Sequence, residues 1–179
     1  MGRGKQEAVD KIVSLMNQAG VKVEDRKVIK AAIDRSTETE NQPAVAIELP
    51  DGRIVTGKTS NLLGASSAAL LNAAKHLAGL PDDLLMIAPS IIEPIQVLKT
   101  GILKGHNPRL HSDETLIALS MSANTNPVAK KALDAIEGLA GCEAHSTVIL
   151  SQVDMDVYRK LGINLTCEPR YQTKKLYHK

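Results

Sequence analysis

The densest group of polar side chains in the sequence lies between Gly105 and Glu114. The stretch between these ends reads His-Asn-Pro-Arg-Leu-His-Ser-Asp, and Ser112 followed by acids is typical of a helix start. Functional groups often lie on loops that a rigid scaffold holds in place. His111 could act as a general base or a ligand, and Arg109 could hold an anion. The alternative is a capped helix start with solvated charges.

A second stretch, Gly52-Arg-Ile-Val-Thr-Gly-Lys-Thr59, matches the G-x4-G-K-[ST] pattern of P-loop nucleotide sites. The residues between the glycines of a P-loop curl around phosphate, but the Ile-Val pair here favours an extended strand. Asp51 followed by Gly is typical of a hairpin turn. We therefore expect a hairpin and no ATP site. One further interpretation stays open, because Lys58, Thr59 and Ser60 precede a helix start and could bind an anion.

Candidate metal ligands come from five His and two Cys. Cys142-x2-His145 has the spacing of a zinc knuckle, but it leads directly into an apolar run. In an extended chain, residues three apart lie on opposite faces, whereas Glu143 and His145 would share one face. Zinc held by Cys142, His145, Cys167 and a loop His is the alternative to buried thiols and ordinary surface histidines. No His-Glu-x-x-His occurs, and we predict no metal site and no other cofactor.

Hydrophobic periodicity predicts the elements that position these groups. Helices are expected at 5–19, 24–36, about 64–78, 90–99, from Ser112, from Pro127 and at 154–161. Strands are expected at 44–49, 53–57, 84–88, 146–150 and 163–167. The helix at 64–78 begins with small residues that would let another backbone or a ligand come close. This order predicts a layered α/β domain at 43–179 after an N-terminal helical segment at 1–42.

Composition narrows the class of protein. The chain has 179 residues and a formal charge of +2, which is ordinary for a soluble domain. It has no Phe or Trp and only three Tyr, so an aromatic platform for RNA is nearly excluded and we expect no nucleic-acid partner. No apolar run is long enough to span a membrane and no signal peptide precedes the first helix, so we expect no membrane partner. Two Cys fit a reducing compartment, and we predict a cytoplasmic protein.

Three stretches resemble a known family. They are Gly57-Lys-Thr-Ser-Asn-Leu-Leu-Gly-Ala-Ser-Ser-Ala, His106-Asn-Pro-Arg-Leu-His-Ser-Asp-Glu, and Gly141-Cys-Glu-Ala-His-Ser-Thr with the later Gly162-Ile-Asn-Leu-Thr-Cys-Glu-Pro. They are similar to the C-terminal part of an uncharacterised bacterial family whose members are sometimes labelled ATP-dependent zinc proteases. The similarity runs from the N-terminal helices to about Gln172. Family members are longer at the N-terminal end, so we expect this chain to be a fragment or a truncated reading frame.

The resemblance implies a fold. The family's C-terminal subdomain has a cytidine-deaminase-like topology, so we expect a three-layer α/β/α sandwich of that topology preceded by two N-terminal helices. A zinc deaminase needs His-x-Glu and Pro-Cys-x-x-Cys, and neither occurs here, so deaminase chemistry is not implied. No residue argument supports the protease label.

Three functions follow as hypotheses, and the sequence leaves open whether the chain is an enzyme. The first is a small-molecule or anion-binding domain of a larger protein, with a site among Lys58, Thr59, Ser60, His106, Asn107, Arg109, His111, Glu143 and His145. The second is a metal-dependent hydrolase that uses the His and Cys groups. The third is a non-catalytic homo-oligomerisation domain whose Ala/Ser-rich helix packs against a partner copy. We expect the loop from His106 to His111 to face the turn that contains Lys58 and Ser60.

Overall fold

The computed structural model describes residues 6–172. The helices are α1 (Gln6–Ala19), α2 (Lys27–Glu38), α3 (Ala65–Leu77), α4 (Pro89–Val97), α5 (Ser112–Ala123), α6 (Pro127–Asp134) and α7 (Gln152–Lys160). The strands are β1 (Ala44–Glu48), β2 (Ile54–Lys58), β3 (Glu143–Ser146) and β4 (Asn164–Cys167). Short 3-10 turns occupy Val23–Asp25 and Ile136–Leu139, and a π-helical turn at Leu98–Ile102 continues α4.

The four strands form one mixed sheet in the order β2-β1-β3-β4. β1 pairs antiparallel with both β2 and β3, and β3 pairs parallel with β4. The parallel pair needs a crossover, which α7 provides between β3 and β4. The chain is thus a mixed α/β structure, as the sequence predicts.

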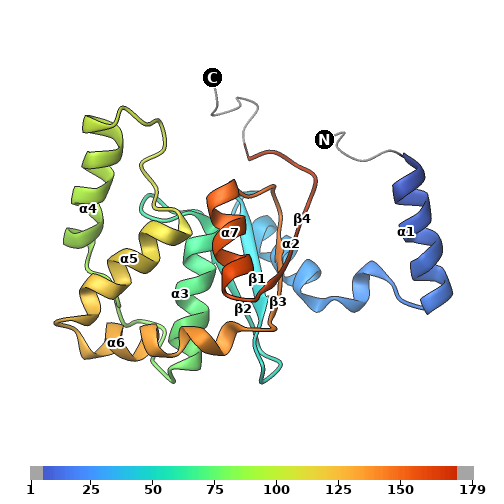
Figure 1. Cartoon of the computed structure of the whole chain (residues 1–179), viewed down its shortest axis with the longest axis horizontal. Helices are drawn as coiled ribbons and strands as arrows, with labels where there is room; N and C mark the ends of the chain where they lie inside the picture. The colour runs from blue at the N-terminus through green and yellow to red at the C-terminus, as the bar shows by residue number, and fades with distance from the viewer. Residues whose placement is uncertain (1–5, 173–179) are drawn as a thin grey trace.

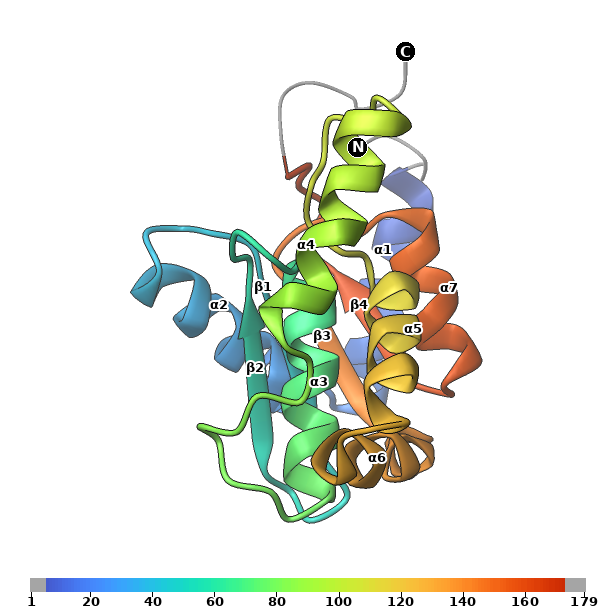
Figure 2. The same ribbon diagram turned by 90° about the vertical axis from the view of Figure 1, so that its left-hand side faces the viewer.

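Helices cover both faces of the sheet (Figures 1 and 2). Val45 and Ile47 of β1 belong to the main core with α3, whereas Ala46 points to the other face and packs with Val28 and Ala32 of α2. This alternation along one buried strand explains its continuous apolar sequence, because both faces are covered. α2 therefore forms one outer layer of the α/β unit, although the sequence assigns it to the N-terminal segment.

The Gly52–Thr59 stretch is a hairpin turn followed by β2, so it lacks the curled loop and helix of a P-loop. Gly52 has a φ of +80° and donates its N–H to Leu49 O at 2.8 Å, which closes the turn. Gly57 lies where β2 crosses α3, and a Cβ there would stand 2.1 Å from Ala69 N. The small residues of α3 therefore serve a close contact within the chain, and this helix is largely buried.

Several expected elements differ from the structure, and α7 begins at Gln152 rather than at residue 154. The strand expected at 84–88 does not form: Met86 and Ile87 are buried, but they lie in an irregular segment before α4. Their apolar run reflects burial, which does not require a strand. α4 begins at Pro89, not at residue 90. The strand expected at 146–150 lies earlier, at β3, because the Ser146 hydroxyl bonds the Val148 backbone and turns the chain away from the sheet.

α1 differs from the other helices because none of its residues is buried, and it stands apart from the sheet (Figure 1). It exposes about half of the surface of Val9, Ile12, Val13 and Leu15. In the described part of the chain, no helix is long and apolar enough to cross a membrane.

Candidate functional site

A histidine–carboxylate pair joins the start of α5 to the first turn of α7. His111 Nδ1 lies 3.1 Å from Asp154 Oδ2. The other carboxylate oxygen accepts the backbone N–H of Ser112 at 2.9 Å and its hydroxyl at 2.7 Å. The Ser151 hydroxyl donates to Oδ2 at 2.7 Å. Asp154 is only 5% exposed, so these donors replace water around its charge.

Local sequence explains this geometry. The Ser151 hydroxyl accepts the N–H of Asp154 and caps α7, which places the carboxyl in the first turn of that helix. α5 begins one residue earlier than its expected Ser cap: His111 is the N-cap residue, and Ser112 is already helical. The expectation of a Ser112 cap is therefore wrong. The Ser112 side chain faces Asp154, while Glu114 accepts the His111 N–H at 2.8 Å.

The pair shifts the titration of both groups. The hydrogen bond to Asp154 raises the pKa of His111 above its ordinary 6.5, although partial burial opposes the charged ring. Burial disfavours the ionised form of Asp154, but the hydrogen bonds from His111, Ser151 and Ser112 outweigh it and hold the pKa of that carboxyl well below its usual range. With Nδ1 bound to the carboxylate, Nε2 is the ring nitrogen left for another partner. It lies 3.5 Å from the amide of Asn107.

The pair borders a small hollow of about 50 Å³ between the 107–111 loop and the starts of α3 and α7. Thr59, Asn107, Arg109 and His111 line it, as do Gly64, Ala65, Ser66, Leu110, Ser151 and Asp154. The structure therefore brings together four of the residues that the sequence singles out.

Contacts with two segments hold the loop in place. Arg109 Nε donates to Ser60 O at 2.6 Å, and Leu110 N donates to Leu62 O at 2.9 Å. The loop thus lies against the turn after β2 at Ser60 and Leu62. On its other side, Lys99 Nζ donates to both Arg109 O and Glu114 Oε2 at 2.6 Å. Lys99 and Glu114 are largely buried, so this bridge fixes the loop between α4 and α5.

Other predicted site residues lie elsewhere. Lys58 is exposed at the end of β2, His106 is exposed at the start of the loop, and neither lines the hollow. Glu143 and His145 share a face of β3, as their spacing indicates, but it is the face covered by α2. There Arg26 pairs with Glu143 and also bonds Thr166.

His145 sits among these groups with little access to solvent. Its Nδ1 lies 2.8 Å from Thr166 Oγ1, and Nε2 is 3.4 Å from a Glu168 carboxylate oxygen without the alignment of a hydrogen bond. Burial lowers the pKa of His145, and the nearby Glu168 charge only partly offsets this. These contacts hold the start of α2 against β3 and β4, and none of these side chains lines the hollow.

The zinc alternative finds no ligand cluster among residues 6–172. Cys142 belongs to the main core, whereas His145 faces α2, so the two cannot share an ion. Cys142 and Cys167 are both free thiols, and burial raises the pKa of each. The structure therefore offers no support for a metal-dependent hydrolase in this part of the chain.

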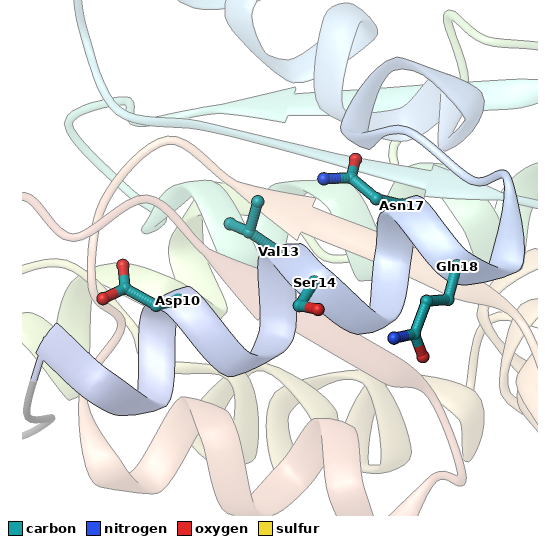
Figure 3. Close-up of a pocket in the computed structure, with 5 residues that line it drawn as sticks. All are labelled: Asp10, Val13, Ser14, Asn17 and Gln18. Atoms are coloured by element: carbon teal, nitrogen blue, oxygen red, sulfur yellow. The ribbon is translucent and has the colours of Figure 1, made fainter.

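A larger, open hollow of about 520 Å³ runs along α1, where Asp10, Val13, Ser14, Asn17 and Gln18 line it (Figure 3). All five side chains come from one exposed helix. Because no second element brings a group toward them, this surface lacks the convergent polar groups of a binding site.

The fold and the hollow define an α/β domain with a His–Asp pair at the junction of three segments. The chain belongs to the family described as "Domain of unknown function DUF1846, C-terminal", whose model matches residues 24–177. It is 53% identical over 169 residues to a UPF0371 protein of Corynebacterium efficiens, covering 94% of this chain and 34% of the relative. It is 50% identical over 177 residues to one of Streptococcus thermophilus, covering 99% and 36%. The chain thus spans about a third of the length of these uncharacterised bacterial relatives.

Sequence reasoning missed Asp154, Ser151 and Ser66. Asp154 falls at the start of an expected helix, where an acid is ordinarily explained by the helix dipole. Its partner His111 is 43 residues away, and no local pattern connects them. For Ser66, the one signal in the sequence is the Gly-Ala-Ser start of α3. Small residues without a capping side chain leave the backbone N–H groups of the first turn accessible to a ligand.

Proposed function

We propose that this domain supplies a binding site for an anionic small molecule to a longer protein, in the hollow beside the 107–111 loop. The observation that carries the proposal is the His111–Asp154 pair at the edge of that hollow. A buried carboxylate that orients a histidine fixes which ring nitrogen meets a ligand. From Nε2, His111 would then donate a hydrogen bond to the bound anion.

The charge of the site favours an anion. Arg109 lines the hollow, and among residues 6–172 its guanidinium bonds through Nε alone, to Ser60 O. The two other guanidinium nitrogens can therefore contact a ligand. The hydrogen bond to Asp154 raises the pKa of His111, so the ring keeps its positive charge to a higher pH than an ordinary histidine. Asp154 is the opposing charge, but its hydrogen-bond donors compensate it.

The size of the hollow limits what it can take. Pockets for whole small molecules measure about 300–1,000 Å³, whereas this hollow measures about 50 Å³. It has room for one functional group of a ligand, such as a carboxylate or a phosphate. The rest of the ligand would lie outside it. This supports a site that is shared with other parts of the longer relatives.

Thermal melting with inorganic phosphate and with citrate tests the proposal. Either anion at a hundredfold its Kd would stabilise the protein by about 2.7 kcal/mol, which is a Tm rise of about 5–10 °C for a chain of this size. Arg109→Ala should lose that rise, and Lys58→Ala should keep it, because Lys58 is an exposed cation outside the hollow. Equal rises in both variants would contradict a site at this hollow.

The finer topology and the cell compartment are also proposals. Helices on both faces of the mixed sheet support the cytidine-deaminase-like arrangement that the resemblance implies. The two free thiols support a reducing cytoplasm.

A further inference from the structure

The first turn of α3 presents backbone donors to the hollow. Gly64 is the N-cap of this 13-residue helix and brings no capping side chain. Within residues 6–172, the N–H groups of Ala65, Ser66 and Ser67 have no acceptor; the first one that bonds back is Ala68 N, to Gly64 O at 3.0 Å. These three residues are 5%, 3% and 0% exposed. Buried N–H groups are rarely left without an acceptor, so we expect an acceptor from outside the helix to bind at this turn.

The Ser66 hydroxyl is a second, independent donor at the same place. Ser66 is 97% removed from solvent and lines the hollow, and its hydroxyl bonds no described residue. Its neighbours are satisfied: the Ser67 hydroxyl donates to Leu110 O at 3.0 Å, and the Tyr158 hydroxyl donates to Ser66 O at 2.9 Å. The Tyr158 contact fixes the backbone that carries the free hydroxyl.

Gly64 keeps the approach to these donors open. Its φ of −68° suits any residue, so the backbone does not require glycine. A Cβ built there would lie 3.7 Å from Leu110 O and 3.8 Å from Ser66 Oγ, in ordinary contact with both. A side chain at Gly64 would therefore fit the fold while occupying the space next to the Ser66 hydroxyl.

We propose that the first turn of α3 binds an oxyanion, the carboxylate or phosphate group of the ligand, through its free backbone N–H groups and the Ser66 hydroxyl. A helix N-terminus attracts anions because its N–H groups and dipole both point toward the ligand. The inference rests on the proposed function and names the donors that would hold the oxyanion in the hollow. Arg109 and His111 border the same hollow and face the remainder of that group.

Calorimetric titration of the full chain with inorganic phosphate, and separately with acetate, tests this site and tells which oxyanion it takes. Ser66→Ala should weaken the Kd of the bound anion about tenfold, since it removes a hydrogen bond to a charge. Ser122→Ala is the matched control: Ser122 is 3% exposed, lies in α5 and donates to Ala118 O instead. It should leave the Kd unchanged.

Gly64→Asp places a carboxylate on the same N–H groups. It should abolish anion binding and raise the Tm by a degree or two, because the introduced group caps α3 as the anion would. Gly64→Asn fills the same space without the charge and should also block binding. If Ser66→Ala and Gly64→Asp bind anions as the wild type does while Arg109→Ala does not, the α3 turn is refuted and the proposed function stands.

A wild type that binds neither anion would instead overturn the proposed function. The Gly64→Asp variant then decides the inference by itself. A higher Tm, with the pKa of the introduced carboxyl lowered in an NMR titration, supports an anion-binding turn. An unchanged Tm with an ordinary pKa refutes it.

Discussion

Asp154→Asn should destabilise the protein by about 3 kcal/mol. The Asn oxygen can still accept both bonds from Ser112, but its NH₂ replaces the oxygen that accepts from His111 and Ser151. Both bonds then lose their charged acceptor. Each hydrogen bond lost to a charged group is worth at least about 1.5 kcal/mol. For a chain of this length, about 3 kcal/mol corresponds to a Tm lower by about 6–12 °C.

The loss of unfolding free energy in Asp154→Asn should depend on pH, and the two pKa shifts fix the direction of that dependence. The raised pKa of His111 means that its charge stabilises the fold fully below the ordinary value of 6.5, and this contribution disappears as the pH rises through the folded-state pKa. The lowered pKa of Asp154 means that its contribution is present above the ordinary 3.8 and disappears as the pH falls. The gap in stability between wild type and Asp154→Asn should therefore be widest between about pH 4 and 6.5.

Urea unfolding of both proteins across pH 3–9 measures the gap. Asp156→Asn is the control: this carboxyl lies on the same helix, two residues on, and pairs at the surface with Arg159. Its removal should change the unfolding free energy by about 0.5 kcal/mol or less. Equal losses for Asp154→Asn and Asp156→Asn, or a gap that stays constant across the pH range, would refute the role of the pair.

Other predictions concern the fold and the thiols. Gly57→Ala should prevent folding or yield insoluble protein on expression, because its Cβ would overlap Ala69 N. Gly52→Ala is the matched change in an open turn at positive φ, and it should lower the free energy of unfolding in urea by only about 1 kcal/mol. A chain lacking α1 should melt within a degree or two of the full chain by circular dichroism, because none of the residues of that helix is buried; a large drop would contradict the observed packing. Cys142 and Cys167 should react slowly with a thiol reagent in the native protein and give two equivalents once unfolded without reductant; fewer than two would contradict free thiols.

Local chemistry accounts for the elements that the sequence predicts well. Asp51-Gly52 defines the hairpin because a residue at positive φ is needed there, and Gly52 has a φ of +80°. Asn126 before Pro127 predicts the start of α6, and its side chain accepts the Val128 N–H at 2.9 Å. In these places the turn or cap lies within a few residues, so the pattern and the structure agree.

Long-range contacts account for what the sequence does not predict. The loop from residue 107 to 111 stands out by its chemistry, but the carboxylate that orients His111 comes from α7, and the first turn of α3 comes from a segment about 45 residues earlier. Glu143 and His145 have the spacing of a shared face, yet only the position of α2 shows that this face is covered. A cluster of polar residues in the sequence does not show whether their side chains face solvent or a covering helix.

The most direct measurement of the central claim is an NMR titration of the His111 ring in the full chain, with and without inorganic phosphate. His106 is an internal control, because it is exposed and lies outside the hollow. Without phosphate, the pKa of His111 should already lie above 6.5, owing to Asp154. Phosphate should raise it further and leave the ring signals of His106 in place. A His111 pKa at or below 6.5, or equal responses of the two histidines to phosphate, would contradict an anion site built around the His111–Asp154 pair.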